Sequence, residues 1–114
     1  MKLNTGLKHV ETAAELNTLI SSHENVMVCC GRMGPMCIPV YKAMENLEAK
    51  YKNTVFRDFL FDSPEADVIK GLLECKDFMG LPFTVYYKNG KAVKATSGIQ
   101  STEQIKIILD QNFG

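Results

Sequence analysis

The spacing of hydrophobic and polar residues predicts alternating strands and helices along the chain. We expect a short strand at residues 7–10, and Thr12 followed by Glu15 has the pattern of a capping box that opens a helix. Residues 25–30 are almost continuously apolar, which is typical of a strand covered on both faces. That strand should therefore lie at the centre of a sheet.

A second helix is predicted from about residue 36 to residue 51 by apolar residues at helical spacing. Pro39 falls in its early turns, where a missing backbone donor should kink the helix or make its start irregular. Residues 54–61 form the next predicted strand. Ser63-Pro64-Glu65 then supplies an N-cap, a first-turn proline and an acid for a third helix that runs to residue 73.

The C-terminal third predicts a hairpin and a helix. Residues 81–87 and 91–96 flank Asn89-Gly90, a turn that suits paired antiparallel strands. Ser101 with Gln104 should cap a last amphipathic helix over residues 102–113. The expected order is β-α-β-α-β-α-β-β-α, an α/β chain with a mixed central sheet flanked by helices in a single domain, residues 1–114.

Composition narrows the classes of partner. The chain has 114 residues with 13 basic and 13 acidic side chains, so it has no net charge of the kind that attracts nucleic acid or anionic lipid. Neither the first residues nor any later stretch has the apolar length of a signal peptide or a membrane span. We expect a cytoplasmic monomer with no nucleic-acid or membrane partner.

Four cysteines, Cys29, Cys30, Cys37 and Cys75, would be free thiols in a reducing compartment. Two of them are adjacent, and both histidines lie upstream, so the spacing matches no usual metal site. We expect no metal and no cofactor.

The C-terminal half resembles the thioredoxins. Gly80-Leu81-Pro82, the run Tyr87-Lys88-Asn89-Gly90-Lys91 and Gly98 correspond in order and spacing to the cis-proline loop, hairpin and late glycine of that family. The resemblance covers residues 7–113. It implies the thioredoxin fold, with Pro82 in the cis form beside the active site.

The redox motif of the family, tryptophan followed by Cys-Gly-Pro-Cys, is replaced here. The sequence reads Arg32-Met33-Gly34-Pro35-Met36-Cys37, so methionines occupy both cysteine positions. Cys37 still falls in the first turn of the predicted helix, where unpaired backbone N–H groups and the helix dipole stabilise a thiolate.

The sequence alone leaves the partner of Cys37 open. Strand alternation points Cys30 and its neighbour Cys29 to opposite faces, and we favour Cys30 as the partner because it is nearer the loop that precedes Cys37. Cys29 would then be a core residue, and the alternative for Cys30 and Cys37 is that they too are small packing residues. In another register Cys37-Ile38-Pro39-Val40 is a monothiol motif that acts through mixed disulfides with glutathione or a partner thiol. We expect Cys75 to be a bystander at the surface or half-buried.

The resemblance also suggests residues that contact substrate. An extended peptide would pair along Met33, Gly34, Pro35, Met36, Leu81 and Pro82. The family's buried proton-handling pair corresponds in position to Met27 and Asp58, which makes Asp58 a candidate general base for a thiol. The alternative is that Asp58, with Arg57, is charge at a strand edge, because one residue of register decides which of them faces inward.

These features lead to three hypotheses. The first is an atypical thiol–disulfide oxidoreductase with Cys37 and Cys30 as the redox pair, acting on protein thiols and disulfides and reduced by a thioredoxin reductase. The second is a redox-inactive binding module that keeps the peptide groove. The third is monothiol transfer through Cys37.

Overall fold

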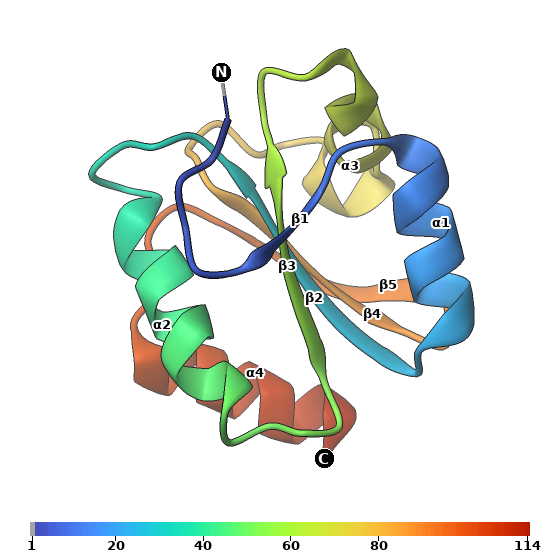
Figure 1. Cartoon of the computed structure of the whole chain (residues 1–114), viewed down its shortest axis with the longest axis vertical. Helices are drawn as coiled ribbons and strands as arrows, with labels where there is room; N and C mark the ends of the chain where they lie inside the picture. Colours follow the sequence, from blue (N-terminus) through green and yellow to red (C-terminus); the bar gives the residue numbers. More distant parts are fainter. Residues whose placement is uncertain (1) are drawn as a thin grey trace.

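The computed structural model describes residues 2–114, in which two layers of helices cover a five-stranded mixed sheet (Figure 1). The strand order is β1-β3-β2-β4-β5. β1 and β2 run parallel to β3, whereas β4 is antiparallel to β2 and β5 is antiparallel to β4. The strands are β1 (Lys8–Val10), β2 (Asn25–Gly31), β3 (Val55–Leu60), β4 (Phe83–Lys88) and β5 (Lys91–Ser97).

The strand β2 is central, and every one of its residues is buried, which confirms the prediction from its continuous apolar run. Successive side chains of β2 point to opposite faces of the sheet, so they contribute to two separate cores. One core contains Met27, Phe56 and Tyr86, and the other contains Val28 and Phe59.

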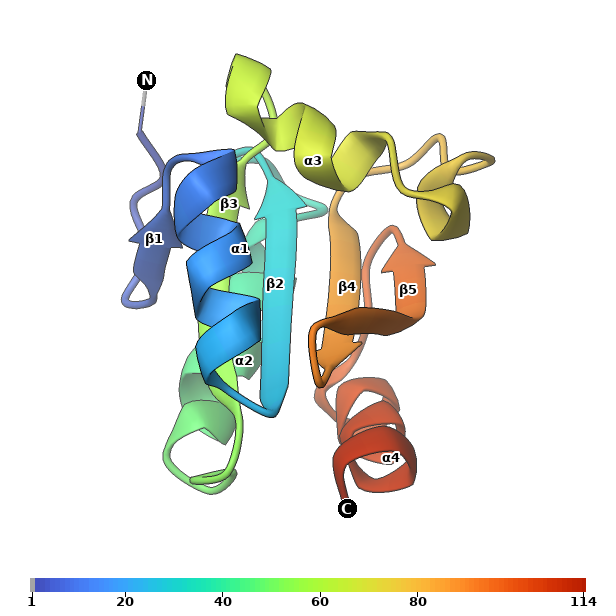
Figure 2. The ribbon, with the colours of Figure 1, turned by 90° about the vertical axis from the view of Figure 1, so that its right-hand side faces the viewer.

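Helices α2 and α4 cover the first of these cores, and α1 and α3 cover the second (Figures 1 and 2). Their bounds are α1 (Ala13–Ser22), α2 (Ile38–Glu48), α3 (Asp67–Lys70) and α4 (Thr102–Phe113). The predicted capping box forms in full at α4, where Ser101 and Gln104 each accept the backbone N–H of the other. At α1, Thr12 accepts the Glu15 N–H at 3.0 Å. None of the helices in residues 2–114 is long and apolar enough to cross a membrane.

The helix α2 begins two residues later than predicted. Residues 35–37 form a turn instead, in which the N–H groups of Cys37 and Ile38 both donate to the Gly34 carbonyl. Pro39 is then the second helical residue, where no backbone donor is required. The proline therefore shapes an irregular helix start and does not interrupt the helix interior.

The predicted third helix is broken into pieces. A 3-10 turn at Pro64–Ala66 leads into the four-residue α3, and a second 3-10 turn covers Leu73–Cys75. Leu72 between them is extended, with ψ of 142°. The N-cap prediction holds, because the Ser63 hydroxyl accepts the Glu65 N–H at 3.1 Å.

The hairpin and the cis-proline form as expected. Asn89 and Gly90 both have positive φ, 52° and 82°, which matches the twist of the strands that they join. The Leu81–Pro82 peptide bond is cis, and it places Pro82 immediately before β4.

Gly31 ends β2 at a point where a side chain has no room. A Cβ at this position would lie 2.7 Å from the Tyr41 hydroxyl, 2.8 Å from Cys37 Sγ and 3.1 Å from Pro82 Cβ. We expect Gly31→Ala to lower the free energy of unfolding by about 1–3 kcal/mol, because overpacking forces neighbours apart. Gly34→Ala, in the same loop with no described atom within 4 Å, is the matched control. Equal urea midpoints for the two variants would contradict this expectation.

Candidate functional site

Cys37 lies in the turn that starts α2, and its sulfur faces the end of β2. The Arg32 backbone N–H donates to Cys37 Sγ at 3.4 Å. The same sulfur and Pro82 both approach Gly31, so the thiol lies where β2, α2 and the cis-proline loop meet. Only 2% of the Cys37 residue surface is exposed. The predicted helix-start thiol is thus in place, but it is covered.

The loop that covers Cys37 is attached on both sides. The Arg32 guanidinium donates to both oxygens of Asp62, from Nη2 at 2.8 Å and from Nε at 2.9 Å, and it lies 5.3 Å from the centre of the Phe61 ring. This ion pair lowers the pKa of Asp62 and raises that of Arg32. On the other side, Met33 Sδ accepts the Asn4 backbone N–H at 3.3 Å.

The residues predicted to contact a peptide differ in exposure. Met33 and Met36 are 37% and 49% exposed, and Pro35 between them is also exposed. Gly34 and Leu81 are half-buried, while Pro82 is buried. The surface available beside the cis-proline is therefore largely methionine.

All four cysteines are free and buried, so the expectation that Cys75 lies at the surface or is half-buried is wrong. Cys29 belongs to the core under α2, together with Cys37, whereas Cys30 and Cys75 belong to the core under α1 and α3. The structure therefore brings Cys37 together with Cys29 on one face of the sheet. It places Cys30, the partner favoured by the sequence, on the opposite face.

Burial raises the pKa of three of these thiols. The pKa of Cys30 rises to about 12 and that of Cys75 to about 11. The pKa of Cys29 is also raised, first by burial and further by the nearby Cys37, Cys30 and Asp58. These three thiols consequently hold their protons near neutral pH.

Asp58 is fully buried, so the alternative of a strand-edge charge is wrong. Both carboxylate oxygens are used: the Thr5 hydroxyl donates to Oδ2 at 2.6 Å, and His9 Nδ1 lies 2.6 Å from Oδ1. Burial raises the pKa of Asp58, against the opposing effect of these two hydrogen bonds. The β2 residue directly opposite Asp58 is Cys29, not Met27, which lies opposite Phe56.

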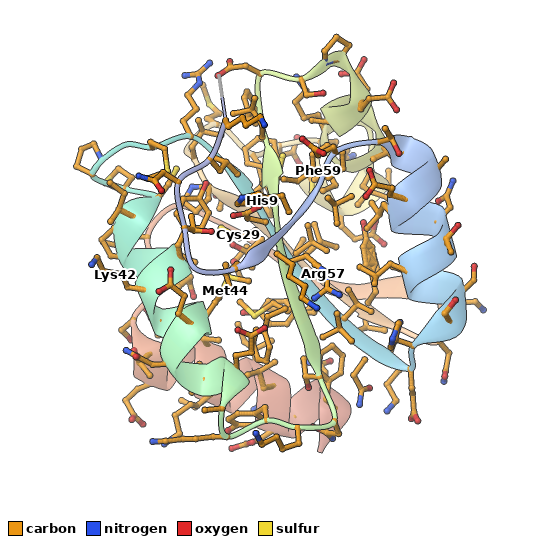
Figure 3. All side chains as sticks on the ribbon, in the orientation of Figure 1. His9, Cys29, Lys42, Met44, Arg57 and Phe59 are labelled. Atoms are coloured by element: carbon orange, nitrogen blue, oxygen red, sulfur yellow. The ribbon has the colours of Figure 1, made fainter. Side chains whose placement is uncertain are left out.

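Strand alternation explains how these side chains are distributed. In Figure 3, His9, Cys29 and Met44 lie toward α2, whereas Arg57 and Phe59 lie toward α1. Sequence reasoning missed His9 and Thr5 as partners of Asp58. An isolated histidine and threonine in the N-terminal segment carry no signal of a contact about fifty positions away.

Residues 2–114 contain no group of three or more His, Cys, Asp and Glu side chains that could hold a metal ion. The reactive groups on the α2 side of the sheet are the thiols of Cys29 and Cys37 and the pair formed by the Asp58 carboxylate and the His9 imidazole.

A mixed sheet in this strand order, a cysteine at the start of α2 and a cis-proline facing it define an α/β protein of the thioredoxin-fold class. The sequence matches no protein-family model and no curated protein. Solved structures of thioredoxins do match, and the chain has the thioredoxin fold.

Three of these solved structures show the extent of the likeness. Thioredoxin from Plasmodium falciparum is 24% identical with a TM-score of 0.71, covering 93% of this chain and 99% of that chain. Mitochondrial thioredoxin 3 from Saccharomyces cerevisiae is 22% identical with a TM-score of 0.74, covering 91% and 94%. Thioredoxin O2 from Arabidopsis thaliana is 14% identical with a TM-score of 0.75, covering 100% of both chains.

The raised thiol pKa values lead to a labelling prediction. At about pH 8, iodoacetamide should alkylate Cys30 and Cys75 at least about 100-fold more slowly in the native protein than in urea, because the thiolate is the reactive form. The native rates should keep rising up to about pH 11, whereas an ordinary cysteine, with a pKa of about 8.5, is almost fully ionised about 1.5 pH units above that pKa and its rate then levels off. Peptide mass spectrometry of timed samples measures each site. Native labelling of either residue within tenfold of its rate in urea would contradict the burial of these thiols.

Proposed function

We propose that the protein is a thiol–disulfide oxidoreductase that acts on protein disulfides through Cys37. The observation that carries this proposal is the position of the Cys37 sulfur, at a helix start, beside Pro82 and within reach of the Arg32 N–H. A backbone donor and the positive end of α2 both favour the thiolate form of a cysteine. The thioredoxin fold of the chain agrees with this chemistry.

We propose Cys29 as the resolving partner. A disulfide requires Cα atoms within about 7 Å and Cβ atoms that face one another. Cys29 and Cys37 line the same core, whereas the Cys30 side chain points through the sheet to the other core. Pairing Cys37 with Cys30 would require the end of β2 to turn over, although residues 26–30 of this strand are paired on both sides.

The proposed reaction transfers two electrons to the substrate. The Cys37 thiolate attacks one sulfur of the substrate disulfide, forms a mixed disulfide and releases the first substrate thiolate. Cys29 then loses its proton to the Asp58 carboxylate and attacks Cys37 Sγ, which releases the second substrate thiolate. The products are a reduced substrate and a Cys29–Cys37 disulfide. A dithiol reductant, such as a thioredoxin reductase, returns the protein to its starting state.

Substrate would approach along the exposed side of the cis-proline. Met33, Met36 and Leu81 offer flexible apolar contacts there, which suit peptides of varied sequence. The backbone around Pro82 would pair with an extended segment as an added strand. A reducing compartment such as the cytoplasm would keep all four cysteines free between turnovers.

Three serine variants test this assignment in an insulin-reduction assay with dithiothreitol as the reductant. The wild type should accelerate insulin reduction, and Cys37→Ser should abolish the acceleration because the attacking sulfur is gone. When reduced Cys29→Ser is freed of dithiothreitol and mixed with insulin, it should accumulate a mixed disulfide that mass spectrometry detects. Cys30→Ser is the matched control, since it is adjacent and equally buried but lies on the other face, and it should retain the wild-type rate. Retained acceleration in Cys37→Ser would refute the proposal.

A redox-independent binding module is the second candidate, and the low exposure of Cys37 favours it. On this hypothesis the methionine surface holds a peptide and the thiols only pack. The carboxymethylated insulin B chain, which has no free thiol, is a suitable probe. Its addition should then shift the NMR signals of the Met33 and Met36 methyl groups equally in the wild type and in the Cys29→Ser/Cys37→Ser double variant. Unchanged methyl signals in both proteins would exclude this candidate.

A further inference from the structure

A buried hydroxyl lies directly opposite the proposed resolving cysteine. Thr84 of β4 is the antiparallel partner of Cys29 of β2, and residues opposite one another on neighbouring strands project to the same face of a sheet. Thr84 has no exposed surface, and its hydroxyl donates to Cys29 Sγ, with 3.9 Å between the oxygen and the sulfur. The two groups therefore meet inside the core under α2, to which Cys29 belongs.

The neighbouring hydroxyls on this face do not take part in the contact. Thr96 of β5 lies opposite Thr84 on its other side, and Tyr86 lies two residues further along β4. Within residues 2–114, the hydroxyl oxygens of Thr96 and Tyr86 are both buried without a hydrogen-bond partner. Of these three hydroxyls, only that of Thr84 makes a hydrogen bond, and its acceptor is the Cys29 sulfur.

A hydroxyl beside a buried sulfur acts mainly on the charged form of the cysteine. A thiol is a weak acceptor, whereas a thiolate accepts a charge-assisted hydrogen bond. Burial raises the pKa of Cys29, and the Thr84 hydroxyl opposes this rise. The nearby Cys37, Cys30 and Asp58 raise the same pKa further. The contact with Thr84 thus favours a thiolate that the rest of the surroundings disfavour.

We propose that Thr84 is a positioning residue whose hydroxyl holds the Cys29 sulfur and stabilises it as the thiolate that resolves the mixed disulfide. This inference rests on the proposed function. In the resolving step the Cys29 proton passes to Asp58, the Cys29 sulfur bonds to Cys37 Sγ, and the substrate thiolate leaves with the electrons of the broken bond. Thr84 keeps its own proton throughout. Its hydrogen bond is strongest while the charge is on Cys29 and weakens once the neutral disulfide has formed.

Removing the hydroxyl should slow resolution, although it also makes the remaining thiolate more nucleophilic. One hydrogen bond to a charged group lowers a pKa by about 1–2. The nucleophilicity of a thiolate falls about half as steeply as its pKa on a logarithmic scale. The gain in thiolate population from Thr84 therefore outweighs the loss of nucleophilicity, by about three- to tenfold in rate.

Two substitutions of Thr84 separate its hydroxyl from its packing. Thr84→Val keeps the branched shape and removes the hydroxyl, whereas Thr84→Ser keeps the hydroxyl and removes a methyl group. If Thr84 only packs, the valine variant should be tolerated and the serine variant harmed, because loss of a buried methyl group leaves a cavity. If the hydroxyl acts on Cys29, the order is reversed. Thr96→Val is the matched control, since it removes a buried hydroxyl that makes no hydrogen bond.

Rapid mixing with Ellman's reagent, 5,5′-dithiobis(2-nitrobenzoate), near neutral pH follows the resolving step. Attack by Cys37 releases the first thionitrobenzoate at a rate proportional to reagent, and attack by Cys29 releases the second at a rate independent of reagent. The reagent is raised until the first release is the faster one, and mass spectrometry of acid-quenched samples follows the mixed disulfide. The second release should be about three- to tenfold slower in Thr84→Val than in the wild type. Thr84→Ser and Thr96→Val should keep the wild-type rate.

The outcomes for the proposed function and for Thr84 are distinguishable. If the wild type keeps its mixed disulfide as long as Cys29→Ser does, the pairing of Cys29 with Cys37 is wrong. If Cys29 resolves the mixed disulfide but Thr84→Val keeps the wild-type rate, the role of Thr84 is overturned. Equal slowing of Thr84→Ser and Thr84→Val overturns it as well. Circular dichroism confirms that the variants are folded, and Thr84→Ala, which also lacks the hydroxyl, replaces Thr84→Val if that variant is not.

Discussion

Three segments of the chain meet at Gly31, where no side chain fits. The end of β2, the start of α2 and the cis-proline loop approach one another so closely that a single added carbon would touch Tyr41, Cys37 and Pro82. This contact brings the Cys37 sulfur to the cis-proline and also covers it. The placement of the thiol and its low exposure therefore have one cause, the close approach of backbone to side chains that only glycine allows.

Much of the fold could be predicted because its signals are local. A continuous apolar run identified the central strand, Asn89-Gly90 identified the hairpin, and Ser101 with Gln104 identified the start of α4. The start of α2 was harder, because residues 36 and 37 have helical spacing but belong to a turn closed by the Gly34 carbonyl. The third helix was predicted too long for a related reason. The apolar residues around Leu72 keep helical spacing, but the backbone at Leu72 is extended and ends the helix.

The candidate site was less predictable, because it depends on register between strands. Cys29 and Cys30 are neighbours in an entirely buried strand, so no polar alternation shows which of them faces α2. The deciding contacts lie on other strands: Asp58 and Thr84 are opposite Cys29. The register of β2 against β3 and β4 is set by tertiary contacts, so the residue pattern of β2 alone does not reveal it. The same reasoning applies to His9, whose contact with Asp58 depends on the β1–β3 pairing.

Met33 stands where the thioredoxins, which this chain resembles, have a cysteine. The ionisable sulfur of this site is instead that of Cys37, which is buried. Thioethers cannot ionise, so under the proposed function a substrate disulfide must reach Cys37 beneath the loop that covers it. That loop is attached through Arg32 to Asp62 and through Met33 to Asn4, and both contacts are at the surface. Exposed ion pairs and single hydrogen bonds stabilise only weakly. On its inner side the loop is also held by the Tyr41 hydroxyl, which donates to the Arg32 carbonyl at 3.1 Å, and by the Arg32 N–H on Cys37 Sγ. Under the proposed function a bound partner must therefore replace these inner contacts as well as the surface ones before its disulfide reaches Cys37.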